Sequence, residues 1–430
     1  MEKVTVIDLG MNGEGIARID NKVVFIPFAL PDEEIEISLS KDKGKFSTGK
    51  LEKVITASKN RVEPPCPYFQ HCGGCNLQHL QYDQQLKFKT SLVKNTLQKV
   101  GQINCEVLPC IASDMPYNYR NKGAFPISIG VGMFTSNSHN VVDINYCYLM
   151  NENINKCLQL VKQWINQYKI KTFNFQTRKG LLKYLVVRSV KQQTLVCLVC
   201  TDYNIPHLQE LSEVLKSLGE YGLALNKNNQ NNSIILGKEF KYISGTTSIK
   251  LNEFDIKYSI DIASFMQVNN DIKLKMYKDI LDNVGGGVVI DAYAGAGLLS
   301  AVVASKADKV ISVEIVPQAS DKARQLVKQN NIKNVEVING DCTKIIPNLT
   351  KDVKEYTVIL DPAHVGCSEQ VISAVKSASK IIYIACNPIA LCKDLKELTK
   401  THNIVKIQPY DMFPQTKHIE TLAVLQLKQN

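Results

Sequence analysis

The stretch Val288-Val-Ile-Asp291-Ala-Tyr-Ala-Gly295-Ala-Gly297 decides the fold of the C-terminal part of this chain. Its apolar start predicts a buried strand at Val288–Asp291, and the two glycines predict a tight turn into a helix at Leu299–Ser305. Glycines spaced by one residue let the backbone approach a ligand closely at the carboxyl end of a strand. A tight strand–helix connection needs the same glycines, so the pair alone is a weak indication of a ligand.

Strands and helices continue to alternate from Asp255 to the C-terminus. Further strands are predicted at Val310–Glu314, Val335–Ile338, Thr357–Asp361 and Lys380–Ala385, with a helix at Ala319–Gln329. This alternation implies an open, mostly parallel sheet that helices cover on both faces. Residues 251–430 are therefore predicted to form a Rossmann-like α/β domain.

An acidic residue strengthens the case for a ligand that contains a ribose. Glu314 closes the second predicted strand, 23 residues after Asp291, where a carboxylate commonly binds ribose hydroxyls. Ser300 stands where the dinucleotide-binding pattern has its third glycine. The sequence therefore favours a mononucleoside such as S-adenosylmethionine over NAD.

The composition predicts a multidomain protein with a polyanionic partner. The 430 residues exceed the roughly 250 at which a single core stops growing, which indicates two or three domains. The 51 basic residues outnumber the 41 acidic ones, and this excess suits nucleic acid, although a solvated basic surface would give the same sum. No apolar run approaches the ~20 residues of a membrane-spanning helix, and no signal peptide is visible. We therefore expect a cytoplasmic protein with no membrane partner.

The N-terminal 58 residues predict a small all-β unit. Short apolar or alternating runs at Val4–Val6, Val23–Ile26 and Ile35–Ile37 are separated by turn residues. Seven basic residues and only two acidic ones lie between Lys41 and Arg61. Small barrels often bind nucleic acid through such a face, although lysines that protect an edge strand would give the same pattern.

Three cysteines with the spacing C-x5-C-x2-C indicate a metal centre in the segment that follows. They are Cys66, Cys72 and Cys75. Gly73–Gly74 lets the last two thiolates turn toward one centre, and clustered glycines are poor filler for a core. The thirteen cysteines of a chain without a secretion signal are not expected to form a disulfide framework.

A fourth ligand is predicted at Cys147, in preference to Cys105 or Cys110. Four thiolates suit either a tetrahedral zinc ion or an iron–sulfur cluster, and the residues alone leave this choice open. The six remaining cysteines outside the C-terminal strand ends are interpreted as core or surface thiols: Cys157, Cys197, Cys200, Cys342, Cys367 and Cys392.

The central region, residues 59–250, shows mixed strand and helix patterns. Pro64–Pro65 marks its start. Its clearest element is a helix from Tyr82 to Val100, where apolar residues recur at helical spacing. Beyond Cys110 the region is rich in Asn, Gln and Lys and shows no motif.

Three residues at predicted strand ends suggest chemistry at the edge that carries the glycine turn. Cys386 follows an apolar strand and precedes Asn387-Pro388, and Asp361 ends the preceding strand. A thiol there is a possible nucleophile, although a lone cysteine is more often structural. Glu420 precedes a late apolar strand and is a possible general base, although exposed glutamates are commoner.

These motifs, taken in order, resemble the RNA uridine-5-methyltransferase family over nearly the whole chain. The first 58 residues are similar to a TRAM domain, an OB-like small barrel. The segments that match the family's motifs are Glu63–Cys66, Cys72–His79, Ser264–Asn269, Asp291–Gly297, Asp361–Pro362, Cys386–Pro388, Asp411–Pro414 and His418–Glu420. The resemblance implies three parts: a TRAM-like β-barrel at 1–58, a central α+β domain with an iron–sulfur cluster at 59–250, and a methyltransferase domain at 251–430. The helical segment at about 82–105 is expected to pack on the methyltransferase domain.

The resemblance also implies the role of each candidate residue. Cys386 would add to C6 of a uracil, and Glu420 would remove the proton from C5 after methyl transfer from S-adenosylmethionine. Five residues fall on positions that contact this cofactor: Gln267, Tyr293, Glu314, Asp341 and Asp361. The metal centre would be a 4Fe–4S cluster on Cys66, Cys72, Cys75 and Cys147, with a structural and RNA-positioning role.

The implied partner is RNA, most directly 23S ribosomal RNA, because the bacterial tRNA-specific branch typically lacks both the TRAM domain and the cysteine cluster. A tRNA T-loop uridine is the alternative substrate, and we expect a monomer. Four residues depart from the family pattern: His364 where many members have arginine, Leu298, Ala385 and Met266. His364 and Leu298 motivate a second class of function, an RNA-binding or ribosome-assembly protein with an impaired catalytic domain. A zinc-containing small-molecule methyltransferase is a third reading, which leaves the TRAM-like part without a role.

Overall fold

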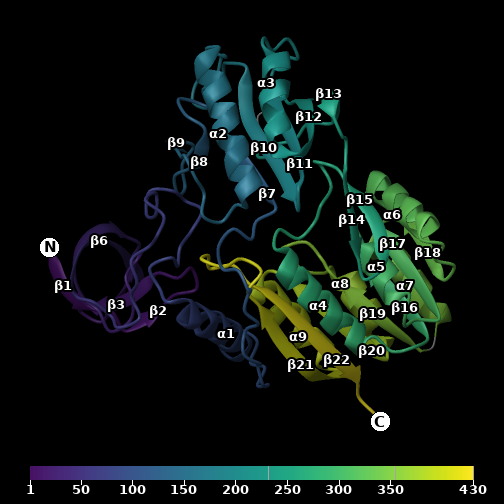
Figure 1. Ribbon diagram of the computed structural model, residues 1–430. Helices are drawn as coiled ribbons and strands as arrows, with labels where there is room; N and C mark the ends of the chain where they lie inside the picture. The colour runs from purple at the N-terminus through teal and green to yellow at the C-terminus, as the bar shows by residue number, and fades with distance from the viewer. Residues whose placement is uncertain (231, 354, 430) are drawn as a thin grey trace. The chain divides into compact units, whose positions relative to one another are not determined.

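The structure is a computed structural model that describes residues 1–230, 232–353 and 355–429 (Figure 1). These residues form two compact units, and each consists of several chain segments. The first unit contains Met1–Phe88, Met115–Gly245 and Phe413–Lys417, and the second contains Lys89–Asp114, Thr246–Met412 and His418–Asn430. The predicted division at residues 58 and 250 stays a prediction, because the compact units follow spatial contacts and not sequence order.

A six-stranded sheet forms the N-terminal part of the first unit. Its strands are β1 (Glu2–Thr5), β2 (Asp8–Leu9), β3 (Gly15–Ile19), β4 (Lys22–Ile26), β5 (Glu34–Asp42) and β6 (Phe46–Thr56). They lie in the order β1-β5-β6-β4-β3-β2, and β1 also contacts β3, so the sheet curls round on itself. Alternate residues such as Val24, Ile26, Ile35 and Ile37 point into a small apolar core.

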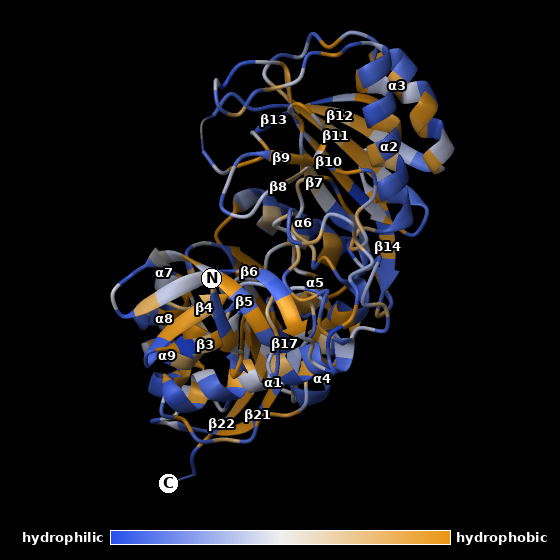
Figure 2. Ribbon diagram, turned by 90° about the vertical axis from the view of Figure 1, so that its left-hand side faces the viewer, coloured by the Kyte–Doolittle hydropathy of each residue, from blue (hydrophilic) through white to orange (hydrophobic). Residues whose placement is uncertain are grey.

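A five-stranded sheet with two helices forms the second part of this unit. Its strands lie in the order β13-β12-β11-β10-β7. Their bounds are β7 (Lys122–Pro126), β10 (Leu182–Val190), β11 (Gln193–Cys200), β12 (Glu220–Lys227) and β13 (Glu239–Gly245). Strands β10, β11 and β12 are mostly buried and rich in apolar residues, drawn orange in Figure 2, and α2 (Glu152–Gln167) and α3 (Leu208–Leu215) pack on this sheet. A short helix, η1 (Lys216–Leu218), and a small hairpin, β8 (Gly132–Phe134) with β9 (Val141–Asp143), complete this part.

A seven-stranded sheet dominates the second unit, and its strand order is β18-β17-β16-β19-β20-β22-β21. The strands are β16 (Val288–Ala292), β17 (Lys309–Glu314), β18 (Val335–Asn339), β19 (Tyr356–Leu360), β20 (Lys380–Ala385), β21 (His402–Tyr410) and β22 (Glu420–Leu427). The first five run parallel, as predicted, whereas β22 pairs antiparallel with both β20 and β21. Strand order reverses between β16 and β19, which is where open α/β sheets bind ligands.

Helices cover the seven-stranded sheet in two rows. One row contains α4 (Asn270–Asn283), α5 (Leu298–Val303) and α6 (Pro317–Gln329). The other contains α7 (Cys342–Asp352), α8 (Glu369–Ala374) with η2 (Val375–Ser377), and α9 (Pro388–Leu398). Right-handed crossovers that run in opposite directions from the switch point place the rows on opposite faces. A separate hairpin, β14 (Ile249–Glu253) and β15 (Ile256–Ile260), precedes α4.

Helix α1 (Tyr82–Lys99) ends six residues before the limit of about 105 that the sequence suggested. Gly101 follows it, and a Cβ atom at this position would lie 2.5 Å from the sulfur of Cys392, so the chain leaves the helix at a close contact. Within the second unit, the Cys392 thiol of α9 donates to the carbonyl of Thr96 at 3.6 Å, and Lys89 forms a buried ion pair with Asp411. The C-terminal half of α1 therefore packs against the seven-stranded part of the chain. Within the described ranges, no helix is long and apolar enough to cross a membrane.

Candidate active site

The pairing of β20 with β22 brings Cys386 and Glu420 together. Ala385, the last residue of β20, lies opposite Thr421 in antiparallel register. Cys386 comes directly after Ala385 and Glu420 directly before Thr421, so the two side chains leave adjacent backbone positions at one sheet edge. The two candidate residues are 34 positions apart in sequence, and only this late antiparallel strand makes them neighbours.

The thiol and the carboxylates at this edge influence one another electrostatically. Burial raises the pKa of Cys386 to about 11, and the carboxylates of Glu420 and Asp361 add to this effect. Burial also raises the pKa of Glu420 well above its usual range, with a further contribution from Asp361. Glu420 is only 3% exposed. Burial beside other carboxylates makes these groups hold protons tightly, and a perturbed acid–nucleophile pair is a common feature of catalytic sites.

Two aspartates flank the point where strand order reverses. Asp291 lies in β16 and Asp361 directly follows β19, the two parallel strands that meet there. The pKa of each carboxyl is raised to about 7, chiefly by burial, and for Asp361 the neighbouring Asp291 is a second cause of this rise. The hydroxyl of Ser300 donates to Asp291 at 2.5 Å. Ser300, which departs from the dinucleotide pattern, therefore holds a strand-end acid in place.

The glycine turn has the tight geometry that the sequence predicted. Gly295 and Gly297 have φ values of 58° and 78°, in the left-handed region that favours glycine. A Cβ atom on Gly297 would lie 2.7 Å from that of Ala323, so α5 and α6 can approach closely only because this residue is glycine. The carboxylate of Glu314 accepts from the backbone N–H of Gly295 at 2.9 Å and of Val316 at 2.7 Å. Glu314 therefore fixes the turn from the end of β17.

Asp341 caps the N-terminus of α7, next to the end of β18. Its side chain accepts from the backbone N–H of Thr343 at 2.9 Å, and this bond lowers the pKa of the carboxyl below its usual range. Glu314 and Asp341 thus lie at the carboxyl ends of two neighbouring strands, β17 and β18. A third predicted residue, Gln267, is half-buried in the segment that joins β15 to α4. Asp261 in this segment accepts from Lys322 of α6 at 2.5 Å.

A chain of hydrogen bonds that the sequence did not indicate supports Tyr293. Tyr293 follows β16 with a φ of 65°, and its hydroxyl is hydrogen-bonded with the thiol of Cys367. Cys367 in turn is hydrogen-bonded with Tyr383 of β20, whose hydroxyl donates to Asp394 of α9 at 2.5 Å. Asp394 also accepts from the backbone N–H of Cys367 at 2.8 Å. Cys367, interpreted from the sequence as a core or surface thiol, therefore links the residue that follows β16 to β20 and α9.

His364 stands where the family pattern has arginine. It lies beside Asn387, the residue that follows Cys386. The side-chain amide of Asn387 donates to the carbonyl oxygen of His364 at 3.1 Å and lies 3.4 Å from its ring Nδ1. Asn387 caps α9 through the N–H of Ile389 at 3.0 Å. The histidine therefore belongs to the structured edge that carries Cys386. Leu298 is the first residue of α5, directly after Gly297.

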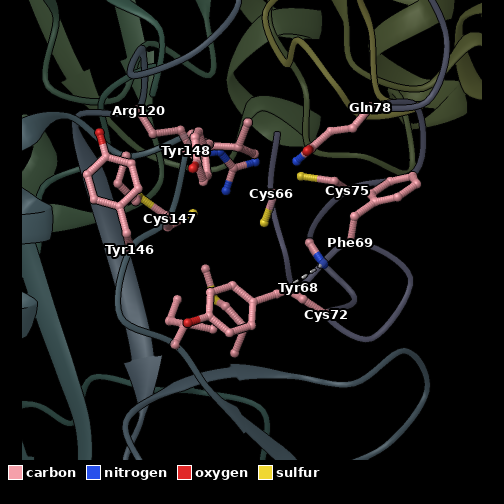
Figure 3. A pocket seen from close by; sticks show the side chains of 15 residues that line it. Cys66, Tyr68, Phe69, Cys72, Cys75, Gln78, Arg120, Tyr146, Cys147 and Tyr148 are labelled. Carbon is pink, nitrogen blue, oxygen red and sulfur yellow. Dashed lines mark hydrogen bonds between the residues drawn. The ribbon is translucent and has the colours of Figure 1, made fainter. Parts of the chain in front are cut away.

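All four predicted metal-ligating cysteines line one cavity of about 40 Å³ in the first unit: Cys66, Cys72, Cys75 and Cys147. Figure 3 shows Cys66, Cys75 and Cys147 arranged around one space, with Arg120 and Gln78 beside them. Cys105 and Cys110 belong to the second unit and do not line the cavity. Burial raises the pKa of all four thiols, and that of Cys72 reaches about 11.

The four cysteines do not form a site for a single ion. Among the described residues, no group of three or more His, Cys, Asp or Glu side chains is arranged to hold one metal ion. The cluster is therefore not shown by the structure and stays a prediction. The six cysteines that the sequence assigned to core or surface positions are all buried, and none of them forms a disulfide.

Comparison with known proteins identifies the family. The model of the tRNA (Uracil-5-)-methyltransferase family matches residues 81–428, and that of the TRAM domain matches residues 2–51. An uncharacterized RNA methyltransferase of Clostridium tetani is 36% identical, with 97% of this chain and 94% of the relative covered. The chain belongs to the tRNA (uracil-5-)-methyltransferase family.

Other members of this family agree with that assignment. An uncharacterized RNA methyltransferase of Halalkalibacterium halodurans is 34% identical, with coverage of 99% of this chain and 97% of that one. The crystal structure of Pyrococcus abyssi tRNA (uracil-54, C5)-methyltransferase in complex with S-adenosyl-L-homocysteine superposes with a TM-score of 0.82. The two sequences are 26% identical, and the alignment covers 98% of this chain and 99% of the Pyrococcus chain. The family resemblance is thus confirmed, as are the TRAM domain and the class of enzyme, an RNA uracil-5-methyltransferase.

Proposed function

We propose that this chain methylates C5 of a uridine in 23S ribosomal RNA, with S-adenosylmethionine as the methyl donor and a covalent bond from Cys386 to C6. The observation that carries the proposal is the juxtaposition of Cys386, Glu420 and Asp361 at one sheet edge. A nucleophile and a base at adjacent positions are what the chemistry of uracil C5 requires.

The reaction needs a nucleophile because C5 of uracil is itself a poor one. The Cys386 thiol would first release its proton to water, and addition of the resulting thiolate to C6 would push electrons onto C5 and give an enolate-like centre, which forms a bond to the incoming methyl group. S-Adenosylmethionine supplies that methyl group when bound, and its sulfur keeps the electrons of the broken bond. Glu420 would then take the C5 proton, the C5–C6 double bond would re-form, and the bond to Cys386 would break.

The raised pKa values suit these roles. Cys386 must lose its proton to attack, and a thiol with a pKa near 11 is an intrinsically strong nucleophile once deprotonated and remains protonated at rest. Burial raises the pKa of Glu420, so its ionised carboxylate would be a stronger base than that of an exposed glutamate. Asp361, which perturbs both groups, would keep their protonation states coupled.

The switch point between β16 and β19 is the proposed binding site of the methyl donor. The tight glycine turn gives backbone access, while Glu314 would bind the ribose hydroxyls. Tyr293, Asp341, Asp361 and Gln267 complete the proposed contacts. The S-adenosyl-L-homocysteine bound by the Pyrococcus relative supports this assignment, because that ligand is the product of the same donor.

The RNA is proposed to bind through the TRAM domain and the first unit's second sheet. The excess of ten positive charges favours a polyanion. The target uridine must leave its stack to reach a half-buried thiol and a buried carboxylate, since these atoms cannot enter a duplex. The TRAM domain and the four cysteines support ribosomal RNA as the substrate.

A tRNA T-loop uridine is the second candidate, and one observation favours it. The Pyrococcus relative acts on uracil 54 of tRNA according to its description, and it matches almost the whole length of this chain. The same overall architecture therefore also serves a tRNA enzyme.

Mass-spectrometric mapping of 5-methyluridine separates the two candidates. We expect one or two sites in 23S ribosomal RNA to lose the modification in cells that lack the gene, and to regain it when the gene is restored. Loss at the tRNA T-loop would move the substrate to tRNA and leave the chemistry unchanged. Unchanged modification in both RNAs would contradict the proposal and would favour a binding role.

We further propose a 4Fe–4S cluster on Cys66, Cys72, Cys75 and Cys147. Four thiols at one cavity match the donor set of such a cluster. A cluster of several iron atoms spaces its thiolates more widely than one ion does, so its ligands need not meet the geometry of a single-ion site. The cluster would tie the Cys66–Cys75 loop to the segment around Cys147 and so shape the RNA-binding unit.

Replacing Cys72 by serine tests this assignment. We expect the anaerobically purified variant to lose most of the bound iron and the brown colour, because hydroxyl oxygen is a poor ligand for iron–sulfur clusters. Cys105→Ser is the matched control, since Cys105 is also half-buried and lies away from the cavity. A colourless wild-type protein that carries stoichiometric zinc would contradict the assignment.

A further inference from the structure

Two polar side chains face the cysteine cavity without belonging to the predicted ligand set. Gln78 and Arg120 both line the cavity, and Figure 3 shows their polar ends near Cys66 and Cys75. Each comes from a different segment: Gln78 from the loop before α1, and Arg120 from the chain before β7. Neither residue takes part in the proposed methyl transfer.

Gln78 hydrogen-bonds with the sulfur atoms of two of the four cysteines. Its side chain contacts both Cys66 and Cys75. The residue is only 2% exposed, and its Oε1 atom has no hydrogen-bond partner in the described ranges. Since a carbonyl oxygen cannot donate, the amide NH₂ is the group that meets the sulfurs. An NH₂ group bonds an anionic sulfur more strongly than a neutral thiol, so thiolates bound to a metal centre would be better acceptors for Gln78 than the free thiols.

Arg120 supplies positive charge from the other side. Its guanidinium interacts electrostatically with Cys75 and Cys147. The Nε atom is buried and has no hydrogen-bond partner among the residues that the structure describes. Backbone bonds hold Arg120 beside the Cys147 segment: its N–H donates to Leu149 at 2.8 Å, and its carbonyl accepts from Asn151 at 3.1 Å.

These two residues together complement a negatively charged group. A buried cation with an unpaired N–H is unfavourable unless an anion lies within reach. Four thiolates around an iron–sulfur core carry a net negative charge, and each added electron increases it. Hydrogen bonds to the sulfurs and nearby positive charge stabilise the more negative, reduced form, and so raise the reduction potential.

We propose that Gln78 and Arg120 are the positioning residues that set the reduction potential of the centre bound by the four cysteines and that protect it from loss. This inference rests on the proposed cluster. Gln78 would donate to the sulfurs of Cys66 and Cys75, and Arg120 would place its charge between Cys75 and Cys147. The arrangement favours uptake of an electron by the cluster and slows dissociation of iron.

The test compares potentials of the anaerobically purified full-length protein, titrated with dithionite and followed by electron paramagnetic resonance. Dithionite supplies the single electron that reduces the cluster. For Arg120→Met, which keeps an unbranched apolar stem and removes the charge, we expect the equilibrium constant for reduction to fall about tenfold. That change corresponds to about 59 mV toward more negative potential for a one-electron couple. Gln78→Met is expected to shift the potential in the same direction.

Two further variants separate charge from packing. Arg120→Lys keeps a positive charge without the planar fork, so its potential should lie between those of the wild type and Arg120→Met. Arg178→Met is the matched control, because Arg178 is exposed and lies outside the cavity. Its potential should equal that of the wild type. Release of iron to a chelator should be faster in Arg120→Met and Gln78→Met than in the control.

The outcomes distinguish this inference from the proposals on which it rests. A wild-type protein without iron and sulfide would overturn both the cluster and this inference. If the wild-type protein contains the cluster but has the same reduction potential and rate of iron release as Arg120→Met and Gln78→Met, this inference alone is overturned. A protein that shows the expected shifts but leaves RNA unmethylated would support this inference and overturn the proposed activity.

Discussion

Cys386→Ala is expected to abolish methylation of RNA, with a loss of at least ~10⁴-fold in kcat, while leaving the methyl donor bound as tightly as before. Without the sulfur, C6 receives no electrons and C5 stays a poor nucleophile, so the methyl group has no acceptor. Nucleophiles of covalent enzymes typically show losses of this size or larger when removed. The donor site lies at the glycine turn and at Glu314, and alanine at residue 386 changes neither.

Single-turnover transfer of radiolabelled methyl groups to RNA measures the loss, and calorimetry with S-adenosylhomocysteine measures binding of the donor product. Cys105→Ala is the control, because Cys105 belongs to the same unit and is similarly half-buried. Its turnover should match that of the wild type. Turnover that survives in Cys386→Ala would show that the assignment of the nucleophile is wrong.

The sequence predicted the parallel half of the methyltransferase sheet closely. Val288–Asp291 and Lys380–Ala385 correspond to β16 and β20 within one residue. Buried parallel strands are continuous apolar runs bounded by turns, and here each is followed by a polar residue at the carboxyl edge. The two strand-end acids, Asp291 and Asp361, were therefore visible from the chain alone.

The same reasoning could not place Glu420 beside Cys386. Their proximity depends on β22, which inserts antiparallel between β20 and β21. Nothing in a local pattern distinguishes an antiparallel insertion from a further parallel strand. Without the family resemblance, Glu420 would have remained one glutamate among many. Tertiary pairing, and not local propensity, builds this part of the site.

Supporting residues were hidden from the sequence for a similar reason. Cys367 and Asp394 link Tyr293 to Tyr383 through hydrogen bonds across segments that are far apart in the chain. Arg120 and Gln78 reach the cysteine cavity from separate loops. Spacing along the chain identifies residues that one short segment brings together, as it did for Cys66, Cys72 and Cys75. It carries no information on partners that arrive from elsewhere.

Glu420→Gln is expected to stop the reaction after methyl transfer and to trap the protein on its RNA. Glutamine cannot accept the C5 proton, so the C5–C6 double bond cannot re-form and the bond between Cys386 and C6 stays intact. We expect turnover to fall by ~10²–10⁴-fold, the usual contribution of a general base. A methylated covalent complex should accumulate, visible as a protein band of reduced mobility that nuclease treatment removes.

Glu369→Gln is the control, since Glu369 is exposed in the first turn of α8. An equal yield of complex with the wild type and Glu420→Gln would contradict the role of Glu420.

The same substitution should stabilise the free protein, and the pH dependence of this effect has a definite sign. Burial raises the pKa of Glu420 in the folded state above its value in the unfolded chain, which is about 4.3. Below the unfolded pKa the carboxyl is neutral in both states and contributes nothing. As pH rises from the unfolded pKa toward the folded pKa, the unfolded chain releases the proton that the folded state still holds, so wild-type stability falls relative to Glu420→Gln, and the loss levels off above the folded pKa. The difference in melting temperature between the variant and the wild type should therefore be small at pH 5 and grow toward pH 8. Asp361 contributes to the raised pKa of Glu420. In an Asp361→Asn background, the difference in melting temperature between glutamate and glutamine at position 420 should therefore be smaller. A catalytic base that lowers the stability of its own fold is consistent with selection for proton transfer at this position, whereas a purely structural glutamate would be expected to stabilise it.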